Sequence, residues 1–231
     1  MIEGLLPPGA VAAEAFDDDA DGRLPAEEAR VVAGAVAGRH REFTTGRLCA
    51  RRALARAGLP PVAVPTGRAG EPCWPEGVIG SITHCAGYRA AAVARACDVT
   101  VLGIDAEPDL PLPDDTLEAI TLPDERRRLR LLERAAPGRA HWGRLLFSAK
   151  ESAYKAWFPL GRRLLDFSDA EADIRPDGSF EVTLRVPGPQ VDGGRLTGFG
   201  GRWTAYGGLL LTAVGTVVTT PRQVLVGTPT N

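Results

Sequence analysis

The stretches Gly103-Ile-Asp-Ala-Glu107 and Lys150-Glu-Ser-Ala-Tyr-Lys155 decide which fold and chemistry we expect, because together they hold three separated carboxylates. An apolar run leads into the first stretch and predicts a strand, on which side chains two apart point to the same face. Asp105 and Glu107 can therefore act as a pair, and a helix carrying Glu151 supplies a third acid. Such oxygen ligands suit magnesium. Spacing alone nevertheless favours a plainer interpretation, namely two acids at a strand end and an ordinary i, i+4 ion pair on a helix.

The composition is that of a soluble globular protein. The chain has 231 residues, of which 44% are apolar and 24% are charged, so one larger domain or two small ones can bury a sizeable core. Its 27 basic and 29 acidic residues give a formal charge of −2, which indicates neither nucleic-acid binding nor a polybasic membrane tag. The sequence shows no leader pattern and no run of about 18 apolar residues, so we expect a cytoplasmic protein.

The four cysteines are Cys49, Cys73, Cys85 and Cys97. They are far apart and include no C-x-x-C pair, so neither a zinc knuckle nor a disulfide framework is indicated. We expect reduced thiols in or near the core.

Periodicity and proline or glycine punctuation predict a mixture of helices and strands. A helical pattern covers residues 27–58, with a break or a second helix expected at Thr44-Thr45-Gly46, and an irregular loop covers residues 59–75. The other predicted elements are strands at 89–96 and 99–104, helices at about 114–132 and 142–158, and a β-rich final third with a hairpin turn at Gly207-Gly208.

A calcium-loop pattern, D-x-D-x-D-G-x5-E, occurs once and is formed by Asp17, Asp19, Asp21 and Glu28 around a glycine. Such loops normally come in pairs between strong amphipathic helices. Here there is one copy, and Pro25 lies inside it. Calcium binding is therefore the weaker interpretation of this segment.

Three segments taken together resemble a known family. They are Gly70-Glu-Pro-Cys-Trp-Pro with Gly80-Ser-Ile-Thr-His-Cys-Ala-Gly-Tyr88, then Gly103-Ile-Asp-Ala-Glu107, then Phe147-Ser-Ala-Lys-Glu-Ser-Ala-Tyr-Lys-Ala-Trp-Phe-Pro159. In this order and spacing the chain resembles the 4′-phosphopantetheinyl transferases of the Sfp/EntD group, particularly the actinobacterial branch. The resemblance extends over roughly residues 27–218.

The resemblance implies an α+β 4′-phosphopantetheinyl transferase fold, a pseudo-two-fold pair of similar halves with coenzyme A bound between them. Residues 1–108 would form the N-terminal half and residues 109–231 the C-terminal half. The implied reaction is attack by a serine hydroxyl of an apo carrier protein on the β-phosphate of coenzyme A, which releases adenosine 3′,5′-bisphosphate. This chemistry needs a divalent ion, basic donors for the pyrophosphate and a base near the hydroxyl.

The resemblance also implies roles for the residues of these motifs. Asp105, Glu107 and Glu151 match the family's metal-binding acids, with Mg²⁺ as the expected ion and Mn²⁺ as the alternative. Glu151 is also the family's candidate base, and the sequence does not separate its two roles. Lys155, one turn after Glu151, matches the lysine that neutralises the transferring phosphate. Lys150 belongs to the same motif and is given a lesser role in coenzyme A binding.

Contacts to coenzyme A are implied for residues of the N-terminal half. His84 matches the family histidine that contacts a phosphate, with Thr83 beside it as a hydroxyl donor. Arg39 and Arg47 fall where relatives bind the 3′-phosphate, a role that suits the planar fork of arginine. Relatives often carry a further basic residue in the proline-rich loop, and here Arg68 is the candidate to replace it.

The implied partners are apo acyl carrier proteins and peptidyl or aryl carrier domains, which are typically small acidic helical bundles. Arg162-Arg163 and Arg126-Arg127-Arg128 are candidate docking clusters, with solvated charged faces as the equal alternative. Tyr154 and Trp157 are packing residues or walls of a pantetheine channel. Because one chain should hold the complete site, we expect a monomer with no nucleic-acid or membrane partner.

Two other functions stay open at the level of the sequence. One is a calcium- or nucleotide-binding module that holds coenzyme A without turnover, and the intact Glu151 and Lys155 count against it. The other is a different magnesium-dependent phosphotransferase. No G-x-x-x-x-G-K-[ST] loop supports the nucleoside triphosphate site that such an enzyme needs.

Overall fold

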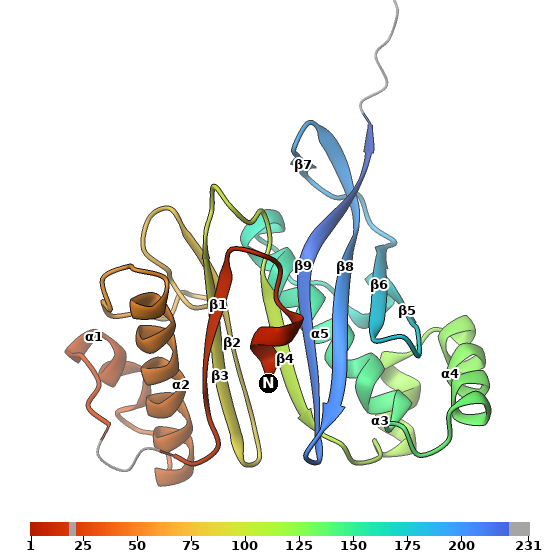
Figure 1. Ribbon diagram of the computed structural model, residues 1–231, viewed down its shortest axis with the longest axis horizontal. Helices are drawn as coiled ribbons and strands as arrows, with labels where there is room; N and C mark the ends of the chain where they lie inside the picture. The colour runs from red at the N-terminus through yellow and green to blue at the C-terminus, as the bar shows by residue number, and fades with distance from the viewer. Residues whose placement is uncertain (19–21, 222–231) are drawn as a thin grey trace, which may run out of the picture.

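Two antiparallel sheets organise the computed structural model, which describes residues 1–18 and 22–221 (Figure 1). The smaller sheet has the strand order β1-β3-β2, and the larger has the order β4-β9-β8-β6-β5, with β7 paired to β8. The strands are β1 (Ala10–Ala15), β2 (Val78–Cys85), β3 (Tyr88–Arg95), β4 (Gly103–Pro108), β5 (Ala170–Ile174), β6 (Ser179–Leu184), β7 (Gln190–Val191), β8 (Gly194–Tyr206) and β9 (Leu209–Pro221).

Helices cover one face of each sheet. α2 packs against β1 and β3, and α5, which lies behind the larger sheet in Figure 1, packs against β4 and β9. The helices are α1 (Ala26–Ala29), α2 (Ala37–Arg56), α3 (Asp114–Ile120), α4 (Pro123–Ala135) and α5 (Trp142–Gly161), with 3₁₀ turns η1 (Ile2–Leu5), η2 (Arg30–Val32) and η3 (Phe167–Asp169). This mixture of helices and strands confirms the predicted α+β class.

The central strand β3 explains how closely α2 approaches the smaller sheet. Successive side chains of a strand point to opposite faces. Ala90 and Ala92 therefore join one apolar cluster, whereas Ala91 and Val93 join another beneath α2. On the helix side of this strand, Gly46 of α2 lies close to β2, and an added Cβ there would be in ordinary van der Waals contact, at 3.4 Å, with a methyl of Ile82.

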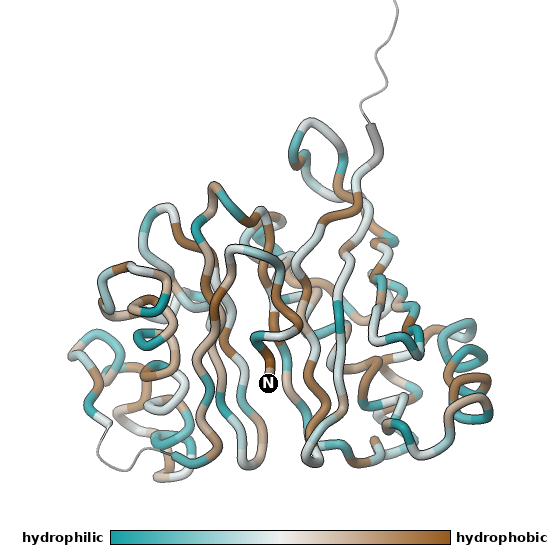
Figure 2. Tube along the Cα trace, in the orientation of Figure 1, coloured by the Kyte–Doolittle hydropathy of each residue, from teal (hydrophilic) through white to brown (hydrophobic). Residues whose placement is uncertain are grey.

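Two clusters hold the larger sheet, and the second is the one that contains Ala90 and Ala92. One packs α5 on the sheet and contains Trp142 and Trp203, whose rings meet edge to face at a centroid distance of 5.5 Å. The other joins the two sheets, with Ala92 from β3, Ile104 from β4 and Leu211 from β9. In Figure 2 the central strands are largely apolar, and hydrophilic residues colour much of α4 at the edge. The two sheets therefore share one continuous apolar interior.

Hydroxyl groups connect the sheets where β2 lies beside β4. The backbone N–H of Ile104 donates to Ser81 Oγ at 3.1 Å, and that of Ala106 donates to Thr83 Oγ1 at 3.0 Å. Both hydroxyls are buried, so they satisfy backbone donors that would otherwise be costly to bury. This junction fixes the height of β4 relative to β2.

The structure corrects three element boundaries. The break in the first helical pattern lies before α2, where Val36 is extended, and the predicted break at Thr44-Thr45-Gly46 is wrong because these residues are buried inside α2. The predicted helix at 114–132 is two helices, because Pro123 begins α4 and residue 122 is extended. The predicted strand at 99–104 is replaced by β4, which contains both acids of the first motif.

The cysteines follow the prediction only in part. All four are free, and Cys49 is buried on the sheet-facing side of α2, but Cys73 and Cys97 are exposed. Burial raises the pKa of the Cys49 thiol to about 11. This thiol is therefore a packing group rather than a nucleophile.

No helix in residues 1–18 and 22–221 combines the length and apolar character that crossing a bilayer requires.

Candidate active site

Asp105 is the centre of the candidate site and is anchored by three side chains. It lies on β4 with 5% of its surface exposed. Its Oδ1 accepts hydrogen bonds from Lys155 Nζ at 2.7 Å and from Thr83 Oγ1 at 3.2 Å, and its Oδ2 accepts one from Ser148 Oγ at 2.8 Å. Lys155 also donates to the carbonyl of Ile104 at 3.1 Å. The strand and α5 are thus joined through this one carboxylate.

Glu107 lies two residues farther along β4, on the same face. Arg144, in the first part of α5, donates to its Oε2 at 3.0 Å. Burial raises the pKa of Glu107, and the neighbouring Asp105 raises it further, whereas Arg144 and Lys155 lower it. The carboxylate is therefore held in place but sits among like charges.

Glu151 is the acid that no cation holds directly. Its side chain is half-buried, and no hydrogen bond or ion pair engages its carboxylate in the part of the chain that the structure describes. Burial raises the pKa of Glu151, as do Asp105 and Glu107, and only Lys155 lowers it. The three predicted acids therefore lie within electrostatic reach of one another.

This donor set fits a hard divalent cation. It offers carboxylate oxygens only, which is the preference of Mg²⁺, and the mutual repulsion of the acids is the kind of strain that a cation relieves. Among residues 1–18 and 22–221, however, no three acidic, histidine or cysteine side chains are already arranged around one point. The three acids therefore influence one another electrostatically, but their oxygens do not yet surround a single metal position.

Arg39 and His84 meet on the opposite side of the junction, where α2 faces β2. Arg39 Nη1 donates to His84 Nε2 at 3.0 Å, and Glu42 lies 3.9 Å from His84 Nδ1. Burial of part of the ring lowers the pKa of His84; Glu42 opposes this shift, while Arg39 and Lys155 add to it. A neutral imidazole beside a guanidinium is therefore expected at neutral pH, and the structure brings these two predicted residues together.

Arg47 is buried, with 5% of its surface exposed. It donates to Thr66 Oγ1 at 2.8 Å, and its guanidinium lies 4.6 Å from the centroid of the Phe43 ring. Its buried Nε has no hydrogen-bond partner among the described residues. An orphaned charged donor of this kind fits an anionic ligand. Arg68, by contrast, is exposed in the loop after Thr66.

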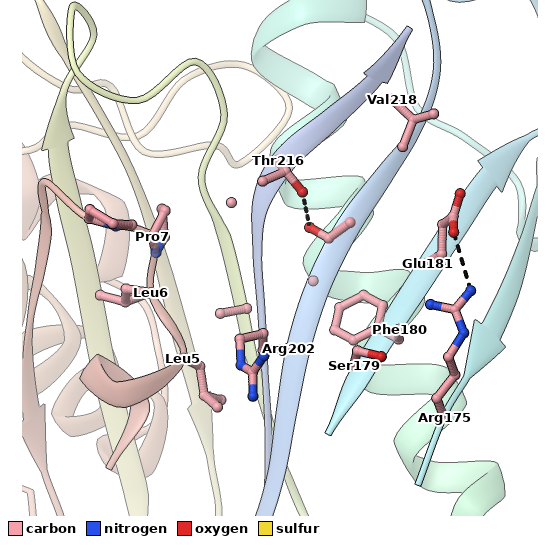
Figure 3. Close-up of a pocket in the computed structure, with 15 residues that line it drawn as sticks. Leu5, Leu6, Pro7, Arg175, Ser179, Phe180, Glu181, Arg202, Thr216 and Val218 are labelled. Atoms are coloured by element: carbon pink, nitrogen blue, oxygen red, sulfur yellow. Dashed lines mark hydrogen bonds and ion pairs between the residues drawn. The ribbon is translucent and has the colours of Figure 1, made fainter. Parts of the chain in front are cut away.

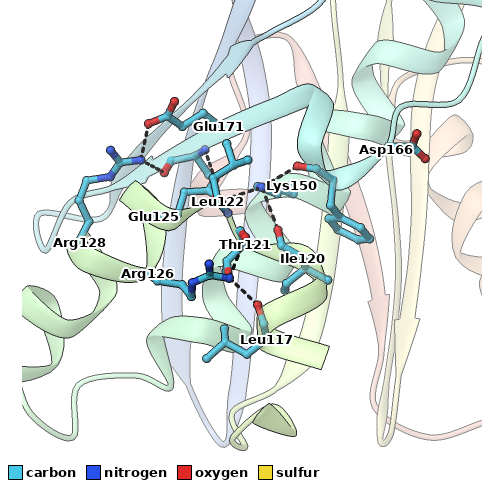
Figure 4. A network of polar contacts seen from close by, with 12 residues as sticks. Leu117, Ile120, Thr121, Leu122, Glu125, Arg126, Arg128, Lys150, Asp166 and Glu171 are labelled. Atoms are coloured by element: carbon cyan, nitrogen blue, oxygen red, sulfur yellow. Dashed lines mark hydrogen bonds and ion pairs between the residues drawn. The ribbon is translucent and has the colours of Figure 1, made fainter. Parts of the chain in front are cut away.

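Lys150 does not reach the site, which corrects the predicted contact to coenzyme A. Figure 4 shows its ammonium pointing into the α4 side of the molecule. It is fully buried and donates to Glu125 Oε2 at 2.9 Å, to Ile120 O at 3.0 Å and to Phe167 O at 2.9 Å. An ammonium has three donors. All of them are committed, so Lys150 holds α5 to α4 and η3 instead of binding a ligand.

Thr83 is also corrected. Its hydroxyl donates to Asp105 and accepts from the Ala106 N–H, and the residue is 2% exposed. A hydroxyl has one proton to donate, and here it goes to the carboxylate. Thr83 therefore orients Asp105 and does not serve as a phosphate donor.

The position of Glu28, the last expected ligand of the calcium loop, argues against the calcium-loop hypothesis. Glu28 is fully buried, where Oε2 accepts from Arg51 at 2.6 Å and Oε1 accepts from the Val64 N–H at 2.7 Å. Both oxygens are therefore used inside the protein. Asp19 and Asp21 lie outside the described residues.

Two contributors to the site were missed from sequence alone. Ser148 lies in the segment Phe147–Pro159, three residues before Glu151. Its hydroxyl at that spacing is a signal in the sequence that could have indicated a site residue. Arg144 carries no signal, because two of its three acceptors are backbone carbonyls, those of Leu110 and Pro111.

A hollow elsewhere in the structure shows no relation to these residues. It has a volume of about 450 Å³ and lies between the N-terminal segment and the sheet, where Leu5, Pro7, Phe180, Arg202 and Thr216 line it (Figure 3). None of the predicted site residues contributes to its wall. The site is therefore defined by converging side chains and not by this cavity.

Comparisons with known proteins identify the relatives of this chain. Residues 27–94 match the model of the 4′-phosphopantetheinyl transferase N-terminal domain, and residues 101–203 match that of the 4′-phosphopantetheinyl transferase superfamily. The 4′-phosphopantetheinyl transferase Svp of Streptomyces mobaraensis is 55% identical over 218 residues, 93% of this chain and 88% of Svp. PptT of Mycobacterium tuberculosis and Npt of Nocardia iowensis, which carry the same enzyme name, are each 44% identical, over 93% of this chain and 99% of their own length.

Proposed function

This chain belongs to the 4′-phosphopantetheinyl transferase superfamily, and from that membership we infer that it transfers 4′-phosphopantetheine from coenzyme A to carrier proteins. The acceptor is a serine hydroxyl of an apo acyl carrier protein or a peptidyl or aryl carrier domain, and the second product is adenosine 3′,5′-bisphosphate. The observation that carries the proposal is the half-buried, unpaired Glu151 beside the Lys155–Asp105 ion pair.

Each side chain of the site is assigned a separate role in the transfer reaction. Lys155, which is 30% exposed, lies where a cation can reach the transferring phosphate and stabilise its developing charge. Glu151 has no hydrogen-bond or ion-pair partner among the described residues, and its pKa is raised by burial, which suits a carboxylate that takes a proton from the serine hydroxyl. On the opposite wall, Arg39 and His84 supply donors for the pyrophosphate, and Arg47 supplies donors for the nucleotide phosphate.

A divalent ion, Mg²⁺ or Mn²⁺, would be held by Asp105, Glu107 and Glu151. When bound, it gathers the negative charge of the pyrophosphate and of the leaving group. Asp105 and Glu107 are themselves paired, with Lys155 and Arg144, and Glu151 is the acid of the three that has no ion-pair partner among the described residues.

An aromatic wall beside Glu151 suits the pantetheine arm. Tyr154 and Phe147 both contact Phe167, at ring centroid distances of 5.4 and 5.8 Å. Trp157 differs because it is buried and donates to the carbonyl of Arg163 at 2.8 Å. Tyr154 is therefore the proposed channel residue, and Trp157 packs the core.

Carrier proteins are proposed to dock at the end of α5. Leu164 is 76% exposed beside the exposed Arg162 and Arg163, an apolar and basic combination that fits a small acidic partner. The alternative cluster is less available. Arg126 donates to backbone carbonyls and Arg128 to Glu171, so these cations already serve the fold.

Reversing two charges tests this docking surface. R162E/R163E should lower kcat/KM for an acidic carrier protein at low salt at least tenfold, and added salt should reduce the difference from wild type. R130E is the matched control, because Arg130 is exposed on α4 outside the proposed surface. Equal losses in both variants, or no loss in R162E/R163E, would reject the surface.

The cellular setting is part of the proposal. Both walls of the site come from one chain, which supports a monomer, and a substrate such as coenzyme A supports a cytoplasmic enzyme. The division into halves at residue 108 also stays a proposal, and the two matching family models lie on either side of residues 95–100.

Intact-mass analysis of an apo carrier protein tests the reaction. Incubation with this protein, coenzyme A and magnesium should add one phosphopantetheine, and EDTA should prevent the addition. A carrier that gains no mass while a known transferase modifies it would refute the function. Addition that is unaffected by EDTA would leave the transfer intact and refute the metal requirement alone.

A further inference from the structure

Arg144 makes three contacts that no other residue of the site could make together. From α5, its Nη1 donates to Glu107 Oε2 at 3.0 Å, its Nε to Leu110 O at 3.2 Å and its Nη2 to Pro111 O at 3.2 Å. The ion pair is largely shielded, because the side chains of Arg144 and Glu107 are 20% and 17% exposed. One guanidinium thus binds an acid of β4 and the segment that follows it.

The segment after β4 is held at further points. The backbone N–H of Asp109 donates to Gly208 O at 2.8 Å, in the turn between β8 and β9. The Asp109 carboxylate accepts from both the backbone N–H and the ring Nδ1 of His141, each at 2.9 Å, directly before α5. The end of β4 and the start of α5 are therefore joined as one unit.

Arg144 also lies on the functional stripe of α5. Residues 144, 148, 151 and 155 follow the i, i+4, i+7, i+11 spacing that places side chains on one face of a helix. Ser148 and Lys155 bind Asp105, and Arg144 binds Glu107, so two acids of β4 are each met by this stripe. Glu151 lies between them and has no hydrogen-bond or ion-pair partner in residues 1–18 and 22–221. The stripe sets the spacing between β4 and the third acid.

We propose that Arg144 is a positioning residue that orients Glu107 for the divalent cation. By occupying Oε2 it leaves Oε1 as the free oxygen, and by binding two carbonyls it fixes where its own charge lies. Lysine keeps the charge, but all its donors lie on one nitrogen, so it cannot reproduce the planar arrangement in which three separate nitrogens of the guanidinium donate. This inference rests on the proposed function of the three acids, and it adds a residue that acts through Glu107 without touching substrate.

The pairing of charges at the site indicates that Arg144 orients Glu107 and does not merely neutralise it. Lys155 is paired with Asp105, so Arg144 is the one cation paired with Glu107 among the described residues. Removing a residue that orients a metal ligand typically weakens metal binding about 10–100-fold. A residue that merely occupies Glu107 in competition with the ion has the opposite signature, because its loss tightens binding.

The test measures Mn²⁺ binding by electron paramagnetic resonance in the full chain, with wild type, R144K and R128K. Arg128 is the matched control, since it also joins a carboxylate and a carbonyl, Glu171 at 2.8 Å and Ala172 O at 3.1 Å, away from the site. We expect R144K to raise the Kd for Mn²⁺ at least tenfold and R128K to leave it within twofold, with similar small losses of Tm. R144Q provides a second variant if R144K does not fold.

A second readout is the magnesium dependence of transfer. R144K should need at least tenfold more Mg²⁺ for half-maximal rate while approaching the wild-type rate at saturation, a shift that a loss of stability alone does not produce. An unchanged or lower Kd in a folded Arg144 variant overturns the inference and leaves the proposed function standing. If wild type itself binds no Mn²⁺ and transfers in EDTA, the metal role of the acids fails, and the inference fails with it.

Discussion

Replacing Lys150 by methionine should damage the fold and spare the ligand site. The ammonium and the Glu125 carboxylate are both 0% exposed, and the substitution removes the ammonium from three acceptors at once. Glu125 keeps its hydrogen bonds from the N–H groups of Leu122 and Ala172, at 2.7 and 2.6 Å, but loses its counter-charge. Breaking a buried ion pair from one side typically costs about 3–5 kcal/mol.

That loss is large enough to measure simply. At about 2–4 °C per kcal/mol for a chain of this size, K150M should lower Tm by about 6–20 °C. Urea unfolding gives the free energy, and calorimetric titration at a temperature where the variant is folded should give a coenzyme A affinity within threefold of wild type. The double variant K150M/E125L, which removes both charges, should recover part of the stability.

The variant K155M should show the reverse pattern to K150M, with a small effect on stability and a large effect on transfer. Lys155 is 30% exposed and pairs with Asp105 at the cleft, so its loss should change stability by less than the buried pair does and reduce transfer at least a hundredfold. The reasoning would be refuted by a K150M protein of wild-type stability whose affinity for coenzyme A has fallen tenfold, because Lys150 would then contact the ligand.

Two further predictions concern a hydroxyl and a titrating acid. T83V should destabilise the protein by about 1–3 kcal/mol, because the buried Ala106 N–H loses its acceptor, and should slow transfer by freeing Asp105. Urea unfolding and single-turnover rates check this, and T83S should restore both; a T83V protein like wild type contradicts it. Burial alone would raise the pKa of Glu14, but a backbone hydrogen bond and the Tyr88 hydroxyl outweigh it, so the folded pKa lies below the ordinary 4.5. Its stabilisation is therefore complete above about pH 5 and is lost as the pH falls through the folded pKa, and E14Q should flatten the acid limb of a stability profile. An unchanged limb in E14Q would show that other acids cause it.

The placement of the three acids could be predicted because their pattern is local, whereas their role as metal ligands came from the resemblance and stays a prediction. Asp105 and Glu107 lie two apart on a strand, and Glu151 sits in a motif whose spacing a helix preserves. The same helix explains the error at Lys150. Neighbouring residues differ by about 100° around a helix, so a motif lysine next to Glu151 faces the core while Lys155 faces Asp105. Motif membership alone does not give that direction.

Other features depend on contacts between distant segments. The break expected at Thr44-Thr45-Gly46 is absent because these residues are buried inside α2, where packing against the sheet outweighs local helix preference. Thr83 was assigned to a ligand because its acceptor, Asp105, lies on another strand. Arg144 gave no signal because carbonyl oxygens have no sequence identity. Local periodicity predicts elements, and long-range polar contacts decide which side chains stay free.

The central claim is that Glu151 serves the chemistry of transfer and not the folding of the protein or the binding of coenzyme A. The most direct test compares E151Q with wild type in single-turnover transfer to an apo carrier protein, with coenzyme A affinity measured by calorimetry on the same samples. Glutamine keeps the size of the side chain and removes its charge. We predict an affinity within threefold of wild type and a rate reduced at least a hundredfold. A rate within threefold of wild type would contradict the account.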